Sequence, residues 1–468
     1  MTNWKQVYRF WHDPASLSIF SGRNSSINTL RAALYTLGCK TNHYETDAVA
    51  EQFRNAGFEI VAFDQVADVY VLNTCTVTAE ADRKSRQFLR RARSLNPHAL
   101  VVAMGCHVEL GTDSDTAFAD IIVGTRGKSR VVDQVLARLG NSATSGATEE
   151  EKEAAEDIFE EFGAVTQQSE TRAYIKIEDG CDSFCTYCAI PFARGRVRSR
   201  SSERVIEEAR QLAAAGFREI VLTGIHICSY GSERGRASEA LPELAAEIGM
   251  IKGIERIRFG SLEPQSITPL FVARCAEVKG LCPHFHLSLQ SGSDDVLRRM
   301  GRSYNKDQFR AAARLVRDLF PTAALTTDVM VGFPGETEAM HRESLDFVRE
   351  IGFSRLHVFR YSRRAGTVAA EMPAQIEKKT SVRRSGEMQA LGQELTLAYH
   401  NRLLGQPQKV LTEQIRSDGT VTGYTDTYVP VLIEAASQLQ SNQLVDVIPF
   451  RCDHEFLYAR YASPLDSC

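Results

Sequence analysis

The chain has 468 residues, of which 43% are hydrophobic and 24% are charged, and its formal net charge is -4 at pH 7. This length suits two to four domains with ample core, and the composition is ordinary for a globular protein. No run of about 18 apolar residues occurs, which argues against a membrane-spanning helix. The slightly acidic balance does not indicate a nucleic-acid binder, although an average charge hides local patches. Residues 1–28 contain no apolar signal segment, so we expect a loose N-terminal extension and no secretion.

Residues 29–140 alternate between short apolar strands and helical stretches. Strands are predicted at Arg31–Thr36, Val69–Leu72 and Leu100–Met104, and helices over Tyr44–Asn55 and over a strongly basic stretch from Arg83 to Arg93. Such alternation is typical of an open parallel sheet in an α/β domain.

A cysteine follows each of these three strands, in a loop rich in Gly, Thr or Asn. These cysteines are Cys39, Cys75 and Cys106. The loops after the strands of an open parallel sheet lie along one edge, where ligands bind, so the three cysteines should converge in space. We interpret them as a site for an iron–sulfur cluster, with three ordinary buried cysteines as the alternative.

Residues 141–170 differ in composition from what precedes and follows them. They begin with small polar residues and continue into an acidic run broken only by Lys152. This composition predicts a solvated linker between domains.

A second alternation of strands and helices begins near Ala173. Strands are predicted at Ala173–Ile177, Glu219–Leu222, Ile254–Phe259, Phe285–Leu289, Ala324–Val331 and Arg355–Phe359, with a helix over Ser202–Ala215 after the first of them. Six such units predict an incomplete parallel barrel over residues 171–402, with its chemistry at the loops that follow the strands.

The loop after the first of these strands carries three further cysteines. Cys181, Cys185 and Cys188 have a three-then-two spacing, and an aromatic residue precedes each of the last two. Clustered thiols, 11 cysteines in all and no signal segment favour metal ligation in a reducing cytoplasm over disulfides. Three thiolates on a short loop hold three irons of a 4Fe–4S cube and leave the fourth iron open for chemistry. A zinc site and buried thiols are the alternatives, but zinc wants four ligands and no second pair follows at suitable distance.

The last part of the chain, residues 403–465, reads as a small all-β barrel. Short β-branched or aromatic segments occur at Gln408–Glu413, Thr420–Tyr424, Tyr428–Leu432, Gln443–Ile448 and Phe456–Tyr461, with turn residues between them. Small OB-like barrels often bind RNA through their loops and one face.

These loops together resemble a known family. The segments Thr36–Asn42, Asn73–Thr78 and Gly105–Cys106 resemble the N-terminal domain of the methylthiotransferases, and the Cys181 loop resembles their radical S-adenosylmethionine (SAM) centre. The C-terminal residues resemble their TRAM domain. The implied fold class is α/β, with an open parallel N-terminal domain, a central partial (β/α)6 barrel and a C-terminal OB-like barrel. The first two loops are most similar to the branch that modifies N6-threonylcarbamoyladenosine beside the tRNA anticodon, with His43 a small departure.

The resemblance implies two 4Fe–4S clusters and two molecules of SAM. The cluster on Cys39, Cys75 and Cys106 would bind or donate sulfur, which one SAM methylates. The cluster on Cys181, Cys185 and Cys188 would yield a deoxyadenosyl radical from the other SAM, and the methylthio group would be placed on C2 of the adenine. An aromatic C–H bond offers no leaving group, so this chemistry needs a cofactor.

Other candidate residues are weaker. Thr223 and Gly224 lie where radical SAM enzymes hold the amino end of SAM, and we expect Glu263, Gln290, Gly332 and Gly335 to contact the rest of it. Turn geometry alone is the alternative for each. The basic stretch Arg83–Arg93 and the alternating arginines Arg194, Arg196, Arg198 and Arg200 are candidates for tRNA phosphates, or else form solvated surfaces.

The implied partners are the tRNA anticodon stem-loop, a reducing electron donor and an unidentified sulfur donor, without a membrane. Two other substrates remain open for the same chemistry, isopentenyladenosine in tRNA and an aspartate of a ribosomal protein. A non-enzymatic iron–sulfur or RNA-binding protein is a third possibility, which three ligands per cluster instead of four disfavour.

Overall fold

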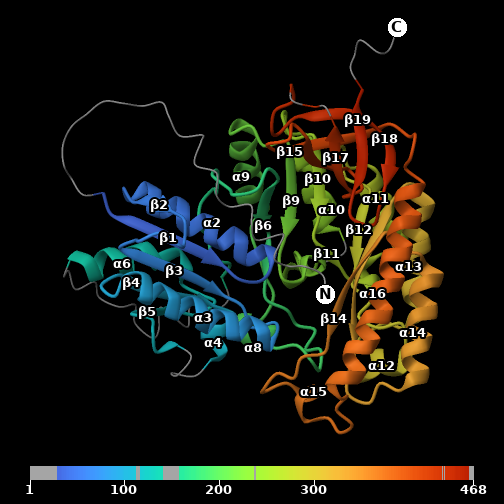
Figure 1. Cartoon of the computed structure of the whole chain (residues 1–468), viewed down its shortest axis with the longest axis horizontal. Helices are drawn as coiled ribbons and strands as arrows, with labels where there is room; N and C mark the ends of the chain where they lie inside the picture. The colour runs from blue at the N-terminus through green and yellow to red at the C-terminus, as the bar shows by residue number, and fades with distance from the viewer. Residues whose placement is uncertain are drawn as a thin grey trace. The chain divides into compact units, whose positions relative to one another are not determined.

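The computed structural model describes residues 29–111, 116–140, 158–236, 239–434, 436 and 438–462 (Figure 1). The chain divides into two compact units. Unit 1 comprises Met1–Glu153 and Glu160–Phe162, and unit 2 comprises Ala154–Phe159 and Gly163–Cys468. No helix of the described residues is long and apolar enough to cross a lipid bilayer.

Unit 1 is built on a parallel sheet of five strands in the order β2-β1-β3-β4-β5. Its elements are β1 (Arg31–Thr36), α2 (Lys40–Asn55), β2 (Glu59–Val61), β3 (Val69–Thr74), α3 (Ala79–Leu95), β4 (Leu100–Gly105), α4 (Cys106–Leu110), β5 (Ile121–Val123) and α6 (Val131–Gly140). The central strand β3 is buried along all six residues, as expected for a strand covered on both faces. The predicted open parallel sheet is confirmed, and the sequence missed β2, β5 and α6.

Helices cover both faces of this sheet. On one face, Val49 and Phe53 of α2 pack with Val131 and Val135 of α6. On the other face, Leu89 and Ala92 of α3 pack against the strands, and the Thr78 side chain caps the first turn of α3. The sheet edge at the carboxyl ends of the strands is therefore held from two sides, which fixes the loops that carry the cysteines.

Unit 2 contains a curved array of parallel strands, recorded as the sheets β10-β9-β6 and β11-β12-β13-β14. The strands are β6 (Ala173–Lys176), β9 (Glu219–Thr223), β10 (Arg256–Phe259), β11 (Ser261–Leu262), β12 (His284–Leu287), β13 (Ala324–Val331) and β14 (Arg355–Arg360), and a two-stranded ribbon pairs β7 (Glu178–Asp179) with β8 (Arg198–Ser199). Strands β10 and β11 are separated only by Gly260, and an isolated parallel bridge pairs Ile257 of β10 with Leu281, three residues before β12. This arrangement confirms the predicted incomplete barrel.

Helices lie against one face of this array. They are α9 (Ser202–Ala214), α10 (Ala240–Gly249), α11 (Pro269–Ala276), α12 (Asp294–Arg299), α13 (Lys306–Leu319), α14 (Glu338–Ile351) and α16 (Lys378–Asn401). Two short helices, α8 (Ile190–Arg194) and α15 (Val368–Glu371), occur in the segments that follow the cysteine loop and β14. Figure 1 shows α13, α14 and α16 beside β12–β14. Alternate strand residues, such as Leu325, Val329 and Val331 of β13, share one apolar core with the helices. The residues between them face the opposite, concave side of the array.

The end of the described chain forms a closed barrel in the strand order β15-β16-β17-β19-β18. Its strands are β15 (Gln408–Ile415), β16 (Val421–Thr425), β17 (Pro430–Glu434), β18 (Leu444–Cys452) and β19 (Leu457–Tyr461). Closure of β18 onto β15 leaves no unpaired edge. The predicted small all-β barrel is confirmed.

The domain limits drawn from the sequence remain predictions. Most of the acidic run falls within residues 141–157, which lie outside the described residues. The remainder of the expected linker is packed, because Phe159 and Val165 are buried and Gln168 forms hydrogen bonds with the backbone of Tyr174.

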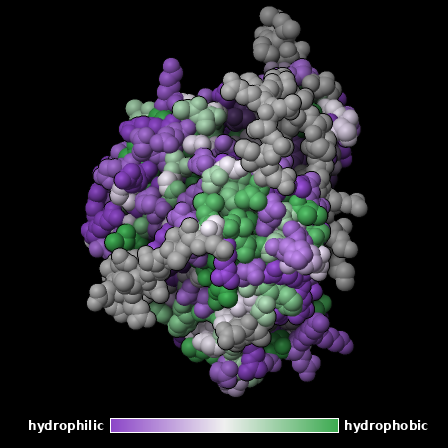
Figure 2. Space-filling view, turned by 90° about the vertical axis from the view of Figure 1, so that its left-hand side faces the viewer, coloured by the Kyte–Doolittle hydropathy of each residue, from purple (hydrophilic) through white to green (hydrophobic). Residues whose placement is uncertain are grey.

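The surface carries both hydrophobic and hydrophilic residues. Figure 2 shows a group of hydrophobic residues surrounded by hydrophilic ones on the face turned to the viewer.

Candidate functional site

The cysteine loop of unit 2 follows the ribbon strand β7. Phe184 adopts a left-handed backbone conformation (φ 43°), which turns the chain between Cys181 and Cys185. The backbone N–H of Ser183 donates to Cys181 Sγ over 3.4 Å, and the N–H of Cys188 donates to the Cys185 carbonyl over 2.9 Å. The turn and its donors orient the loop as thiolate ligation requires.

The three thiols lie within electrostatic reach of one another. Burial raises the pKa of Cys188 to about 12, and the neighbouring Cys185 and Cys181 contribute in the same direction. Burial likewise raises the pKa of Cys181, with Cys185 adding to the shift. Three crowded, desolvated thiols become thiolates only beside a compensating positive charge, and bound iron supplies one. The donor set therefore fits an iron–sulfur cluster.

A buried ionic network anchors this loop from below. Asp179 accepts from Lys176 at 2.7 Å and from Arg194 at 3.0 Å, and it also accepts from the backbone N–H of Gly180 at 2.9 Å. Gly180 has φ 90°, and a Cβ there would lie 1.9 Å from the Arg196 carbonyl oxygen, so only glycine fits. Buried ion pairs of Asp179 therefore hold the start of the cysteine loop in place.

This network corrects the prediction that four alternating arginines contact tRNA phosphates. Arg194, Arg198 and Arg200 are buried, and Arg194 and Arg200 pair with Asp179 and Glu208. Only Arg196 is exposed, beside Asp182 and over the Phe184 ring. The prediction is wrong for the three buried arginines, because the buried carboxylates of Asp179 and Glu208 already neutralise their charge.

Arg302 links the cysteine loop to one of the predicted SAM residues. Its guanidinium donates to Cys185 Sγ over 3.2 Å and to the Tyr304 hydroxyl over 3.2 Å, and it forms an ion pair with Glu263. His226 Nε2 lies 3.9 Å from the same Glu263 carboxylate. Glu263 therefore lies next to the cysteine loop, where Arg302 neutralises its carboxylate, and its contact with SAM stays a prediction.

Thr223 and Gly224 stand at the carboxyl end of β9, beside the buried Glu178. A Cβ on Gly224 would lie 2.7 Å from Glu178 Oε2, so the glycine lets this carboxyl approach the backbone. Glu178 accepts from the His226 N–H at 2.6 Å, and its other oxygen has no hydrogen-bond partner among the described residues. Burial raises the pKa of Glu178 to about 8.

The remaining predicted SAM residues lie at the ends of β12 and β13. Gln290 has φ 65° and exchanges backbone hydrogen bonds with Asp328 and Met330 of β13. A Cβ on Gly332 would lie 2.7 Å from Ser381 Cβ, and one on Gly335 would lie 2.0 Å from the Arg299 guanidinium. Both glycines also have a positive φ, 74° and 76°, so backbone geometry accounts for them, and their contact with a cofactor stays a prediction.

The cysteines of unit 1 lie at one edge of its sheet. Cys39 precedes α2, Cys75 follows β3, and Cys106 follows β4. Register pairs Thr36 with Asn73 and Thr74 with Gly105, so the three cysteine loops leave neighbouring strands at the same level. A Cβ on Gly38 would lie 2.7 Å from Cys75 Sγ, which places the first loop directly against the second cysteine.

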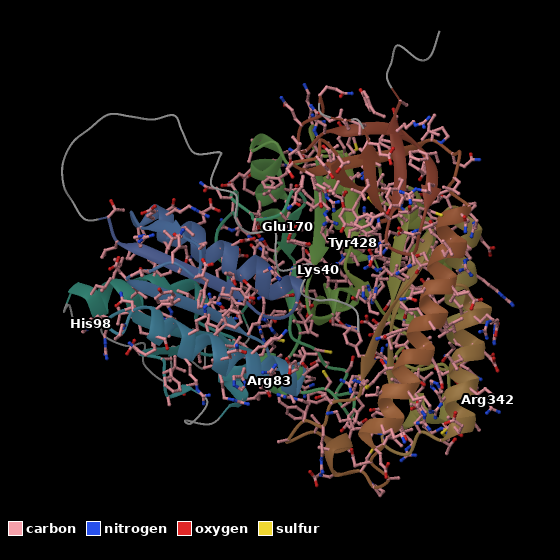
Figure 3. The ribbon with its side chains drawn as sticks, viewed as in Figure 1. Lys40, Arg83, His98, Glu170, Arg342 and Tyr428 are labelled. Carbon is pink, nitrogen blue, oxygen red and sulfur yellow. The ribbon has the colours of Figure 1, made fainter. Side chains whose placement is uncertain are left out.

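Buried polar side chains hold these loops together. Asn42 Nδ2 donates to the carbonyls of Leu37 and Thr74, over 2.7 and 3.1 Å. Asn73 Nδ2 donates to the Asn42 carbonyl over 2.9 Å, and beneath it Lys128 and Glu45 form a fully buried ion pair. Figure 3 labels Lys40, the first residue of α2, and Arg83, an exposed residue of α3.

A second link joins the loops of Cys75 and Cys106. Asp82 of α3 lies 2.9 Å from His107 Nδ1 and accepts from the Thr76 hydroxyl at 3.1 Å. Each of these partners is the direct neighbour of a cysteine. The three thiols, two of them buried on a rigid edge, fit iron–sulfur ligation, and their role as ligands stays a prediction.

Neither trio is arranged for a single metal ion. Within the described ranges, no group of three or more His, Cys, Asp and Glu side chains is placed to hold one ion, and none of the described cysteines is in a disulfide. In an iron–sulfur cube each thiolate binds a different iron, so its ligands stand farther apart than those of one ion.

Comparison with known proteins gives the family. Residues 175–348 match the radical SAM superfamily, and residues 31–124 match the uncharacterized protein family UPF0004. The threonylcarbamoyladenosine tRNA methylthiotransferase MtaB of Bacillus subtilis is 38% identical over 417 residues, covering 87% of this chain and 91% of that protein. A tRNA-2-methylthio-N(6)-dimethylallyladenosine synthase of Pelotomaculum thermopropionicum is 32% identical over 402 residues, covering 83% and 87%.

The fold has a solved counterpart. The radical SAM methyltransferase TsrM of Kitasatospora setae, with cobalamin and a [4Fe-4S] cluster bound, superposes with a TM-score of 0.55 at 16% identity, over 73% of this chain and 77% of that one. At this identity the likeness concerns the fold alone. From the relatives and the family matches, the chain belongs to the radical SAM methylthiotransferase family, and it is a transferase.

Sequence reasoning missed the side chains that support the site. Arg302 and Asp179 have no motif of their own, and Glu178 is only three residues before the first cysteine of its loop. For Glu178 and Asp179 the sequence did contain a signal, because both are acidic residues directly after an apolar strand. A carboxyl group buried at such a place needs a partner inside the protein.

Proposed function

We propose that this protein transfers a methylthio group to C2 of N6-threonylcarbamoyladenosine beside the tRNA anticodon, in the cytoplasm. The observation that carries the proposal is the 38% identity, over 91% of its length, with a relative named threonylcarbamoyladenosine tRNA methylthiotransferase. The relative named dimethylallyladenosine synthase is 32% identical. The first and second cysteine loops of unit 1 support the same branch.

In this proposal the two cysteine trios hold two [4Fe–4S] clusters. Cys181, Cys185 and Cys188 bind the cluster that meets SAM, and Cys39, Cys75 and Cys106 bind the cluster that handles sulfur. When bound, the clusters and SAM supply the radical and the sulfur atom that no side chain provides.

The side chains of the chain itself orient these groups and exclude water. Arg302 holds Cys185 Sγ and Glu263 in one arrangement, while the Asp179 network fixes the base of the loop. Thr223, Gly224, Gln290, Gly332 and Gly335 lie at the carboxyl ends of the strands, where a ligand of a parallel array binds. Positioning a reactant at a fixed, dry place lowers the barrier without any acid or base.

The C-terminal barrel supplies a surface suited to RNA. On β18 and β19, Arg451 lies 3.5 Å from the Tyr458 ring centroid and Arg460 lies 4.9 Å from that of Phe450. Phe450 is 40% exposed, and Ile448 on the same strand is 44% exposed. Guanidinium groups beside exposed rings combine phosphate attraction with base stacking, the usual means of binding single-stranded RNA.

A second candidate is the same reaction on dimethylallyladenosine, which the relative from Pelotomaculum thermopropionicum favours. The two candidates differ in the N6 substituent, which is polar and anionic in one and apolar in the other. The modified adenosine that is methylthiolated with the higher kcat/KM is the substrate.

The test is anaerobic incubation of the iron-reconstituted protein with SAM, a strong reductant and anticodon stem-loops that carry either modified adenosine. Nucleoside mass analysis should find a methylthio group on threonylcarbamoyladenosine, and Cys181→Ala should abolish it. Modification of dimethylallyladenosine alone would replace this proposal by the second candidate. Modification of neither, in a protein that cleaves SAM, would overturn both.

A further inference from the structure

A row of polar side chains lines the concave face of the strand array in unit 2. His286 of β12, Asp328 of β13 and His357 of β14 alternate with residues that pack in the helix-covered core, such as Phe285, Val329 and Val358. The sheet register places Thr326 opposite His286, and Asp328 opposite His357. The three side chains therefore project from neighbouring strands on the side that no helix of the array covers.

Short contacts connect these side chains. His286 Nδ1 lies 3.0 Å from the Thr326 hydroxyl, and its Nε2 lies 3.4 Å from Asp328 Oδ2. The rings of His286 and His357 have centroids 5.8 Å apart. Thr326 also meets His284 Nε2 at 3.1 Å, so one hydroxyl fixes the orientation of two imidazoles.

The row is accessible rather than sealed in the core. The Asp328 side chain is 30% exposed and that of His286 is 13% exposed, while His357 is exposed. Two residues before His357, Arg355 is exposed on the same face of β14, and it forms no ion pair with any residue that the structure describes. A ligand inside the array would meet two imidazoles, one carboxylate and one guanidinium.

The mouth of the array leads to this row. Asp328 lies three residues before Val331, where β13 ends and the glycine loop begins, and Gln290 bonds to the backbone on either side of it, at Asp328 and Met330. If the adenine of the tRNA binds at the carboxyl ends of the strands, a long substituent on its N6 atom would extend along the concave face toward Asp328 and His357. The three residues from Val331 to Asp328 span about 10 Å along the strand.

We propose that His286, Asp328 and His357, with Arg355 below them, read the N6 substituent of the adenosine and determine which modified tRNA is accepted. This inference rests on the proposed function and deepens it. A threonylcarbamoyl group offers N–H donors to Asp328, a carbonyl and a hydroxyl to the imidazoles, and a carboxylate to Arg355. A dimethylallyl group offers no hydrogen-bonding atom to these side chains, so it would displace their water without giving a hydrogen bond in return.

Binding measurements test this assignment apart from catalysis. Fluorescence anisotropy with the reconstituted full chain would compare an anticodon stem-loop bearing threonylcarbamoyladenosine with the same RNA bearing unmodified adenosine. The wild type should bind the modified RNA at least about tenfold more tightly, since a site built for polar groups discriminates strongly. Asp328→Asn and His357→Ala should reduce this preference to about twofold or less, and Arg355→Gln should reduce it in part.

The control is His98→Gln, an exposed histidine of unit 1 labelled in Figure 3, which should keep the wild-type preference. Circular dichroism checks that each variant is folded, and His357→Ala alters an exposed side chain, so it serves if Asp328→Asn misfolds. Unchanged preference in Asp328→Asn and His357→Ala, or no preference in the wild type, would overturn the inference. A wild type that prefers the modified RNA but never methylthiolates it would overturn only the proposed function.

Discussion

At the scale of single residues, the site depends on charged groups that are buried beside the backbone. Glu178 is the clearest case, because its side chain is fully buried and burial raises its pKa to about 8. Backbone N–H groups of His226 and Ile225 oppose this shift, but they do not cancel it. At neutral pH the folded protein therefore keeps a proton on this carboxyl.

This shift predicts a specific pH dependence. The ordinary pKa of the carboxyl is 4.5, so between pH 4.5 and about 8 the folded chain holds a proton that the unfolded chain has lost. The contribution of Glu178 to stability is then lost progressively as the pH rises through this window, and it is constant above it. Glu178→Gln should remove this dependence, because the amide keeps the acceptor for the His226 N–H without titrating.

Urea unfolding followed by circular dichroism would measure the effect. Relative to the wild type, Glu178→Gln should gain about 3 kcal/mol in the free energy of unfolding between pH 5 and pH 8. Equal pH profiles for the two proteins would contradict the buried, protonated carboxyl.

At the scale of elements, α16 holds the loop that follows β13. Arg384 of α16 donates to Glu336 Oε2 over 2.8 Å and to the Glu336 carbonyl over 2.9 Å. The same carboxylate accepts from the Gly332 N–H at 2.7 Å, which closes the loop on itself. Burial raises the pKa of Glu336, so its charge depends on this arginine and on the Gly332 donor.

Arg384→Gln should therefore loosen the loop. Breaking a buried pair by removing one partner costs about 3 kcal/mol, and we expect faster hydrogen exchange in the peptide that spans residues 332–338. If the loop touches SAM as the sequence predicts, the KM for SAM should rise about tenfold with little change in iron content.

Arg383 of the same helix provides the matched control. Its side chain is half exposed and pairs with Glu338 and Glu387 at the surface. Arg383→Gln should leave hydrogen exchange of the loop at the wild-type rate, because exposed ion pairs contribute little. Equal protection of the loop in all three proteins would show that Arg384 does not hold it.

The elements also show where sequence patterns suffice. Strands β1 and β13 occur with the predicted bounds, because short segments rich in apolar and β-branched residues that end at a glycine-containing loop predict strands. Strands β2 and β5 have three residues each and partly exposed side chains, so no periodicity marks them. The basic helix was predicted, whereas the burial of Arg194 and Arg200 was not, because ion pairs with Asp179 and Glu208 are set by tertiary packing.

The candidate site likewise contains residues that the sequence predicts and residues that it does not. The six cysteines were predicted from spacing and from their place after strands, which depend on local sequence alone. Arg302 lies 117 residues from its sulfur acceptor Cys185, and Lys128 lies 83 residues from Glu45. Pairings at such separations follow from the completed fold, and a single sequence carries no signal for them.

At the scale of the whole molecule, the C-terminal barrel and the parallel array belong to one compact unit. Tyr428, labelled in Figure 3, stacks on Tyr424 with centroids 5.0 Å apart and meets the His284 ring at 5.0 Å. The guanidinium groups of Arg172 and Arg258 lie 4.9 and 4.7 Å from its ring. Cationic and aromatic side chains thus join the barrel to the strand array.

Removing this ring should free the barrel from the array. Tyr428→Ala should lower the free energy of unfolding by about 2 kcal/mol and speed hydrogen exchange in β16 and β17. Tyr428→Phe keeps the ring and should resemble the wild type in both measurements. Equal behaviour of the Ala and Phe variants would contradict an anchoring role for the ring.

The proposed reaction requires two separate iron–sulfur sites, one in each unit. The most direct measurement is the iron content of the anaerobically reconstituted chain and of two triple variants, Cys39→Ala/Cys75→Ala/Cys106→Ala and Cys181→Ala/Cys185→Ala/Cys188→Ala. We expect about eight irons in the wild type and about four in each variant, with reductive SAM cleavage lost only in the second. A wild type with about four irons or fewer, or one variant with the full wild-type content, would contradict this expectation.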